Sequence, residues 1–303
     1  MRNDHLKLCL VDMNNGVANE ATRCFRRISD AFQARVRAAN PRLETSLKHV
    51  QPRNLGELPG EDMDLVLSSG GPGSPYDGYE DPWCTGYRKF VDSVIERSLQ
   101  RAATAPGLLV VCHSFEIVVS HLQVAKLQPR DKRKFGVMPA YMTPEGMRSP
   151  LLSPFGDRLF AFEHRNWEAV DLDEKRLREL GGQLLARESR DGVSKGRGLM
   201  AFKFAPGVEG TQFHPEADRA GVVAWINKPD MAAAFKDAYG DYTYEQMIDT
   251  LADPTRLART FALLIPGWLT REFNRLAAAR GWQPLGPPVQ DMTEFQKEFP
   301  AAV

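Results

Sequence analysis

The sequence predicts a three-layer α/β protein, in which a mostly parallel β-sheet is covered by helices on both faces and followed by a helical extension. Two observations carry this prediction. Apolar runs of strand length alternate with segments of helical periodicity between residues 6 and 123, an order that is typical of parallel strands. After Glu216 the pattern becomes helical. We therefore expect one α/β domain in residues 1–220 and a helical extension in residues 221–303.

The first half of the chain supplies the alternating elements. Residues 6–11 form an apolar run that predicts a buried strand. A helix is expected next, because apolar side chains recur at helical spacing at Ala21, Phe25, Ile28, Phe32 and Val36. Further strands are expected at residues 46–50, 63–67 and 107–111, and further helices around residues 90–95 and 113–123.

The second half changes character. Residues 126–137 are rich in charge. Successive strands with turns between them are expected at residues 159–162, 184–186, 199–204 and 208–213. Helices are expected at residues 232–239, 244–251, 257–264 and 269–280, with the pairs Asp253-Pro254 and Pro266-Gly267 separating them.

Composition excludes several classes of function. The 39 basic and 39 acidic residues balance, so no nucleic-acid partner is expected. The four cysteines form no CxxC pair and no metal-ligand spacing, so we expect no metal site, and no motif indicates a cofactor. The apolar run near the N-terminus is too short for a signal peptide, and no stretch approaches the length of a membrane span. We expect a soluble, cytoplasmic protein without a membrane partner.

A cysteine stands at a position suited to catalysis. Cys112 ends the apolar run 107–111 and precedes a helical segment, and an α/β fold presents nucleophiles at such strand-to-helix turns. Far downstream, His214 and Glu216 follow another apolar strand. Cysteine, histidine and glutamate together can supply a nucleophile, a base and an acid that orients the base.

A glycine-rich loop follows the strand at 63–67. Glycine lets backbone N–H groups approach a developing oxyanion closely, so the loop GGPGSP, which begins at Gly70, is a candidate oxyanion site. It carries no GKS, GKT or GxGxxG signature of a phosphate loop. Taken alone, it could equally be a tight turn after a strand.

In combination these motifs are more specific. GGPGSP after a strand, a strand-end cysteine and FHPE, in that order, resemble the class I glutamine amidotransferases over about residues 5–220. The resemblance implies a doubly wound, flavodoxin-like sheet. Carried over to this chain, it implies Cys112 as nucleophile, His214 as its base and Glu216 as the residue that orients the base, with the backbone N–H groups of Gly71 and His113 as the oxyanion hole. The implied reaction releases ammonia from glutamine through a thioester on the cysteine.

The nucleophile turn departs from the family pattern G-x-C-x-G-H-Q. Val110 and Ser114 replace its two glycines, and Phe115 and Glu116 stand where the family has histidine and glutamine. Because that glutamine helps to hold the substrate in several members, Glu116 puts glutamine itself in doubt as the substrate. A carboxylate there could meet an ammonium group of a substrate, or it could be a first-turn acid favoured by the helix dipole.

Four residues are candidates for substrate binding. Gly70 begins the glycine loop, and Glu116 lies one turn into the helix after the nucleophile. His164 and Arg165 follow a predicted strand near the place where the family has a histidine loop that lines its site. Arg165 could bind a substrate carboxylate through two hydrogen bonds, or it could be a surface residue.

Three hypotheses of function follow. The first is a glutamine amidotransferase that supplies ammonia to a separate synthetase subunit, because residues 220–303 carry no ATP-binding motif. The second is a stand-alone amidase, γ-glutamyl hydrolase or acyl transferase of the same fold that acts on a different small-molecule amide. The third is a non-catalytic interaction protein. The intact cysteine, histidine and glutamate favour an enzyme over a scaffold.

Overall fold

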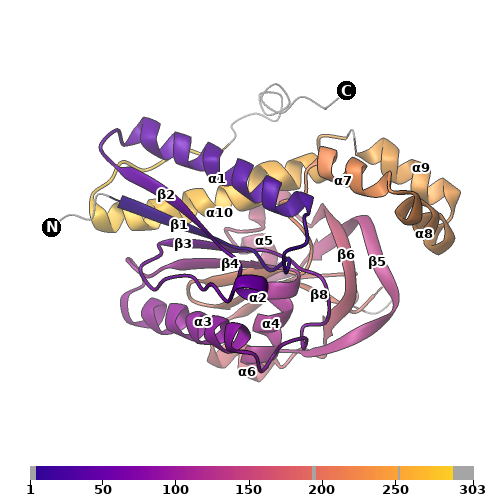
Figure 1. Cartoon of the computed structure of the whole chain (residues 1–303), viewed down its shortest axis with the longest axis horizontal. Coiled ribbons are helices and arrows are strands. Elements are labelled where there is room, and N and C mark those ends of the chain that lie inside the picture. The colour runs from indigo at the N-terminus through magenta and orange to yellow at the C-terminus, as the bar shows by residue number, and fades with distance from the viewer. Residues whose placement is uncertain (1–4, 193–195, 252, 289–303) are drawn as a thin grey trace.

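The structure is a computed structural model that describes residues 5–192, 196–251 and 253–288 (Figure 1). Its helices are α1 (Glu20–Ala39), α2 (Pro52–Leu55), α3 (Pro82–Arg101), α4 (His113–Leu122), α5 (Pro144–Arg148), α6 (Glu174–Glu179), α7 (Arg219–Ile226), α8 (Pro229–Tyr239), α9 (Asp241–Thr250) and α10 (Leu257–Arg280). Its strands are β1 (His5–Val11), β2 (Glu44–Val50), β3 (Leu65–Ser68), β4 (Gly107–Val111), β5 (Lys126–Met142), β6 (Arg158–Val170), β7 (Gln183–Arg187), β8 (Leu199–Ala205) and β9 (Val208–Thr211).

Within the described residues, the strands form one nine-stranded sheet in the order β2-β1-β3-β4-β9-β8-β7-β5-β6. The strands from β2 to β9 in this order pair in parallel, as the alternation of strands and helices predicts. From β9 onward every pairing is antiparallel, so the whole sheet is mixed. The change of direction includes the tight turn at residues 206–207, because a chain that returns from β8 to β9 without a crossover helix must reverse.

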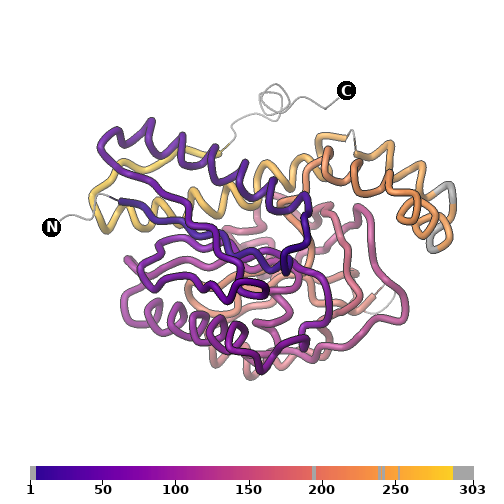
Figure 2. The backbone as a smooth tube through the Cα atoms, viewed as in Figure 1, coloured from indigo at the N-terminus to yellow at the C-terminus, as the bar shows by residue number. Residues whose placement is uncertain are grey.

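Helices cover both faces of the sheet, which confirms the predicted three-layer α/β class. Figure 1 shows α1 and α10 on one face, and α3 and α4 on the other. The first face buries Leu8 and Leu109 of the sheet against Phe25 of α1 and Trp268 of α10. The tube view in Figure 2 follows the yellow C-terminal helix as it returns along the indigo α1. The last helix is therefore part of the main core.

The helices of the C-terminal extension pack in two different places. While α10 packs in the main core, α7, α8 and α9 pack against the long β5–β6 hairpin through Phe135, Ile226, Phe235 and Met247. The domain boundary at residue 220 stays a prediction. The expected break at Pro266-Gly267 is wrong, because α10 continues through Pro266. Proline removes one helical hydrogen bond, and the buried apolar face of α10 outweighs that loss.

The charged segment 126–137 belongs to a strand that periodicity does not reveal. It lies in β5, which pairs with β6 over most of its length. The charges are tolerated because Lys134 and Arg130 form ion pairs with the buried carboxylate of Glu188.

No helix among the described residues is long and apolar enough to span a membrane. In the same residues, no group of His, Cys, Asp and Glu side chains could hold a metal ion.

Candidate active site

Cys112 occupies a strained turn between β4 and α4. Its φ of 51° and ψ of −105° lie in a region that L-residues rarely adopt, at a cost of about 1–3 kcal/mol. Backbone hydrogen bonds hold it there: its N–H donates to Thr211 O at 2.8 Å, and its carbonyl accepts from Glu116 N–H at 2.9 Å. Such a turn is the geometry of a nucleophile elbow.

The two residues that replace the family's glycines are accommodated by their neighbours. Val110 pairs with Gly210 across β4 and β9, and a Cβ at Gly210 would lie only 2.4 Å from Val110 Cγ2. The absence of a side chain at Gly210 therefore leaves room for Val110. The hydroxyl of Ser114 accepts from Val111 N–H at 3.0 Å and lies 2.9 Å from the carbonyl oxygen of Ser68, so it ties the turn to β3.

His214 and Glu216 meet Cys112 from the end of β9. His214 Nδ1 lies 2.8 Å from Glu216 Oε1, and the Glu216 side chain is only 1% exposed. A Cβ added to Gly70 would lie 2.8 Å from His214 Cε1 and 3.2 Å from Cys112 Cβ. Gly70 therefore lies directly against the cysteine and the histidine, where a side chain would not fit.

The imidazole of His214 is electrostatically prepared to carry a proton. Burial disfavours its charged form, but the carboxylate of Glu216 and the adjacent Cys112, which hydrogen-bonds to it, raise the pKa of His214 well above its usual value. An imidazole in this state can exchange a proton with a neighbouring thiol and later deliver it to a leaving group.

The glycine loop is held in place by contacts with Met13 and Arg53. A Cβ on Gly71 would lie 2.1 Å from the carbonyl oxygen of Met13, so only glycine allows this approach. Arg53 of α2 donates to that same carbonyl oxygen at 3.0 Å and to Pro72 O at 2.6 Å. His113 is the first residue of α4, where a backbone N–H has no partner within its own helix. Gly71 and His113 thus lie in the two segments that flank Cys112.

Glu116 is buried beneath the site. Its carboxylate accepts a 2.9 Å hydrogen bond from Gln212 Nε2, and its residue is 3% exposed. Burial raises the pKa of Glu116 to about 7, although Gln212, Arg165 and His214 act in the opposite direction. Glu116 therefore connects the first turn of α4 to the segment that carries His214.

This environment predicts a specific pH dependence of stability. Glu116 binds its proton more tightly in the folded protein than when unfolded, so ionising it costs stability as pH rises from about 4.5 to about 7. At about 1.4 kcal/mol per pKa unit, the full cost is about 3 kcal/mol. We expect Glu116→Gln to be more stable than the wild type by up to this amount at pH 8.

Urea unfolding of both proteins at pH 4.5 and pH 8 measures the effect. Near pH 4.5 the two free energies of unfolding should lie much closer together, because Glu116 is then protonated in the folded protein and about half protonated when unfolded. A difference between the two proteins that is the same at both pH values would show that burial does not control this carboxyl group.

The other predicted substrate residues are placed differently. Arg165 is buried, and its guanidinium pairs with Glu163 at 2.7 Å and with Glu188 at 3.4 Å. These contacts occupy the guanidinium with protein carboxylates and do not support the prediction that it binds a substrate. His164 is exposed and packs edge-to-face on Trp225 of α7, with ring centroids 5.1 Å apart. Its role in substrate binding stays a prediction.

Sequence reasoning missed three residues around the site. Arg53 braces the glycine loop, Gln212 holds Glu116, and Trp225 lies against Phe162 and His164. Gln212 stands within the motif that supplies His214, so its position was a usable signal. Arg53 and Trp225 lie far from the motifs in sequence, and only their contacts identify them.

No protein-family model matches the sequence, and no curated protein matches it. Among solved structures, a glutamine amidotransferase from Thermotoga maritima matches with a TM-score of 0.56 at 17% identity, covering 88% of this chain and 98% of its own. A glutamine amidotransferase from Methylobacillus flagellatus matches with a TM-score of 0.56 at 14% identity, covering 94% of this chain and 98% of its own. The predicted resemblance is confirmed at the level of the fold, which is that of the class I glutamine amidotransferases.

Proposed function

We propose that this protein hydrolyses the side-chain amide of glutamine through a thioester on Cys112 and releases ammonia. The observation that carries the proposal is the convergence of three chain segments at the strained cysteine: Gly70 against Cys112 and His214, and His214 against Glu216. The fold shared with glutamine amidotransferases supports this choice of substrate class.

The geometry suggests a role for each group in the reaction. Cys112 Sγ attacks the carboxamide carbon while His214 takes the thiol proton, and the oxyanion of the tetrahedral intermediate is met by the backbone N–H groups of Gly71 and His113. The carbon–nitrogen bond then breaks, and His214 returns the proton to the leaving nitrogen as ammonia departs. Water attacks the γ-glutamyl thioester, releases glutamate and restores the thiol.

Glu216 supports both transfers of the proton. Its carboxylate holds the Nδ1 side of His214, which leaves Nε2 for the sulfur and the leaving group.

We propose that the ammonia is used by a separate synthetase subunit.

A second candidate function is hydrolysis of a different amide or γ-glutamyl compound. The observation that favours it is Glu116, an ionisable group where the family carries glutamine, held next to the catalytic segment by Gln212. Ammonia release from L-glutamine separates the two. Labelling of Cys112 by an electrophilic acyl donor without turnover of glutamine would support this second candidate and contradict the first.

Substitution of Arg53 tests whether its hydrogen bonds hold the glycine loop in the shape that catalysis needs. We expect Arg53→Ala to lower kcat by about 10–100-fold with little change in KM, because the loop that presents Gly71 loses the guanidinium bond to Pro72 O, and the Met13 carbonyl behind Gly71 loses its own. Arg42→Ala, which removes an exposed arginine, is the matched control and should leave both constants unchanged. An Arg53→Ala enzyme with unaltered kcat would show that the loop holds its shape without this brace.

A further inference from the structure

A row of polar side chains crosses one face of the sheet near the start of β9. Gln183, Lys203 and Glu209 are paired in register across β7, β8 and β9. Their neighbours Leu184 and Val208 point to the opposite face and are buried in the core beneath α3 and α4. Glu209 is buried under Trp268 and Arg271 of α10, whereas Lys203 is half-buried and Gln183 is exposed. A sheet face covered by helices is normally apolar, so the row marks the place where the helical layer ends.

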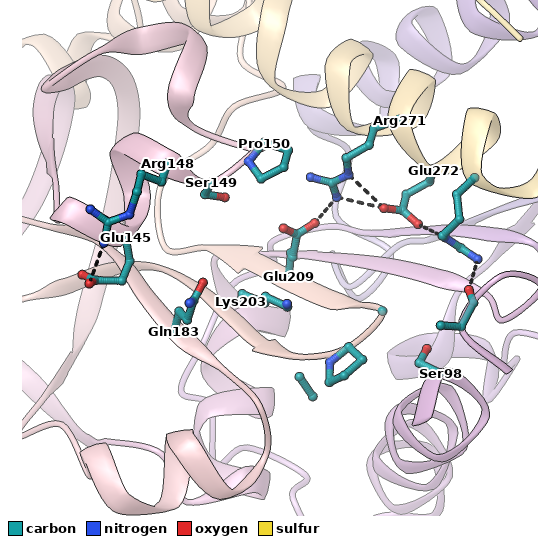
Figure 3. A pocket seen from close by; sticks show the side chains of 15 residues that line it. Ser98, Glu145, Arg148, Ser149, Pro150, Gln183, Lys203, Glu209, Arg271 and Glu272 are labelled. Carbon is teal, nitrogen blue, oxygen red and sulfur yellow. Dashed lines mark hydrogen bonds and ion pairs between the residues drawn. The ribbon is translucent and has the colours of Figure 1, made fainter. Parts of the chain in front are cut away.

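A cavity of about 440 Å³ lies over this row (Figure 3). Figure 3 shows α10 with Arg271 and Glu272 along one side, and Glu145 and Arg148 of α5 on the other. Ser98 of α3 completes the lining. The volume falls in the range of small-molecule sites. The cavity lies where β9 begins, whereas Cys112 and His214 lie where β4 and β9 end.

The charges that line the cavity do not balance. Arg271 is held by the carboxylates of Glu209 and Glu272, and Arg275 by Glu272. Arg148 pairs with Glu145 on the exposed surface of α5. Within the described parts of the chain, Lys203 is half-buried and has no carboxylate partner. The lining therefore carries four cations and three carboxylates, an excess of one positive charge.

Ser98 belongs to the wall of the cavity, but its Oγ is enclosed by protein atoms among the described residues. It therefore has no part in binding a ligand. Gln183 adds an exposed amide at the edge of the same cavity.

We propose that this cavity binds a small anionic molecule through a carboxylate or phosphate group. Lys203 supplies the counter-charge, and Gln183 and Arg148 supply hydrogen-bond donors from either side. An ammonium group that is half-buried and unpaired gains most from such a partner, because the partner restores the interactions that water no longer provides in full. The site lies apart from the catalytic edge of the sheet, so occupancy leaves access to Cys112 open.

Calorimetric titration of the full chain with inorganic phosphate, and separately with citrate, tests the proposal at constant ionic strength set by sodium chloride. We expect saturable binding of at least one anion, with a dissociation constant below about 10 mM. Which anion binds more tightly identifies the group. Lys203→Gln should raise that constant at least about tenfold, because it removes a charge-assisted hydrogen bond.

Lys89→Gln, which removes an exposed lysine of α3, is the matched control and should bind as the wild type does. Lys203→Met keeps the aliphatic stem and serves if the glutamine variant does not fold. Absence of saturable binding of both anions to the wild type would overturn the proposal. So would equal affinities of the wild type and a folded Lys203 variant.

Discussion

Cys112→Ala is expected to abolish ammonia release from glutamine, with a loss of at least about 10⁴-fold in kcat. Without the sulfur no thioester can form, and the imidazole of His214 has no thiol to activate. Cys84→Ala is the matched control, since Cys84 is also a buried free cysteine and packs in the core beside α3 residues such as Val91. It should retain activity close to that of the wild type.

The measurement is a coupled assay of ammonia, made on variants whose far-ultraviolet circular dichroism matches the wild type. Activity of Cys112→Ala above about one per cent of the wild type would exclude a covalent mechanism at this residue. A wild type that releases no ammonia from glutamine would exclude the proposed substrate, and it would leave the cysteine chemistry to be examined with other amides.

Gly71→Ala should cost about 10²–10³-fold in kcat. An added Cβ would lie 2.1 Å from the carbonyl oxygen of Met13, far inside contact distance and against backbone that cannot rotate away. The loop must shift to relieve this contact, and its N–H then no longer points at the oxyanion. A loss of this size is typical for one oxyanion-hole donor.

Gly267→Ala provides the contrast. Gly267 lies within α10, where an added Cβ meets nothing within 4 Å. Because alanine favours a helix over glycine, this variant should keep full activity and gain up to about 1 kcal/mol in free energy of unfolding. Steady-state kinetics and urea unfolding of both variants measure the two effects. Normal kcat in Gly71→Ala would exclude Gly71 as an oxyanion donor.

Residues 6–123 were the most predictable part of the fold. Apolar strands and amphipathic helices alternate there, and local periodicity is sufficient to identify them. The charged strand β5 was not predictable in this way, because its charges are satisfied by Glu168 and Glu188, which lie far away in sequence. Pro266 was misread as a break for a related reason: the packing of α10 on the sheet outweighs one lost hydrogen bond.

The candidate site likewise has residues that the sequence predicted and contacts that only the tertiary structure shows. Three short motifs pointed to Cys112, Gly71 and His214, because the residue types and their order along the strands are local features of the chain. The accommodation of Val110 by Gly210 could not be read in advance, since it depends on the register of β4 against β9. Register places side chains of distant segments within contact distance, and no local pattern records it.

Residue identity and local periodicity were thus enough to indicate the α/β class and the set of groups capable of cysteine chemistry. The tertiary structure decided what those groups touch. It placed Arg165 among protein carboxylates, and it buried Glu116 against Gln212. The physical reason is that burial and pairing set the charge state and availability of a side chain, and both arise only when remote segments pack together.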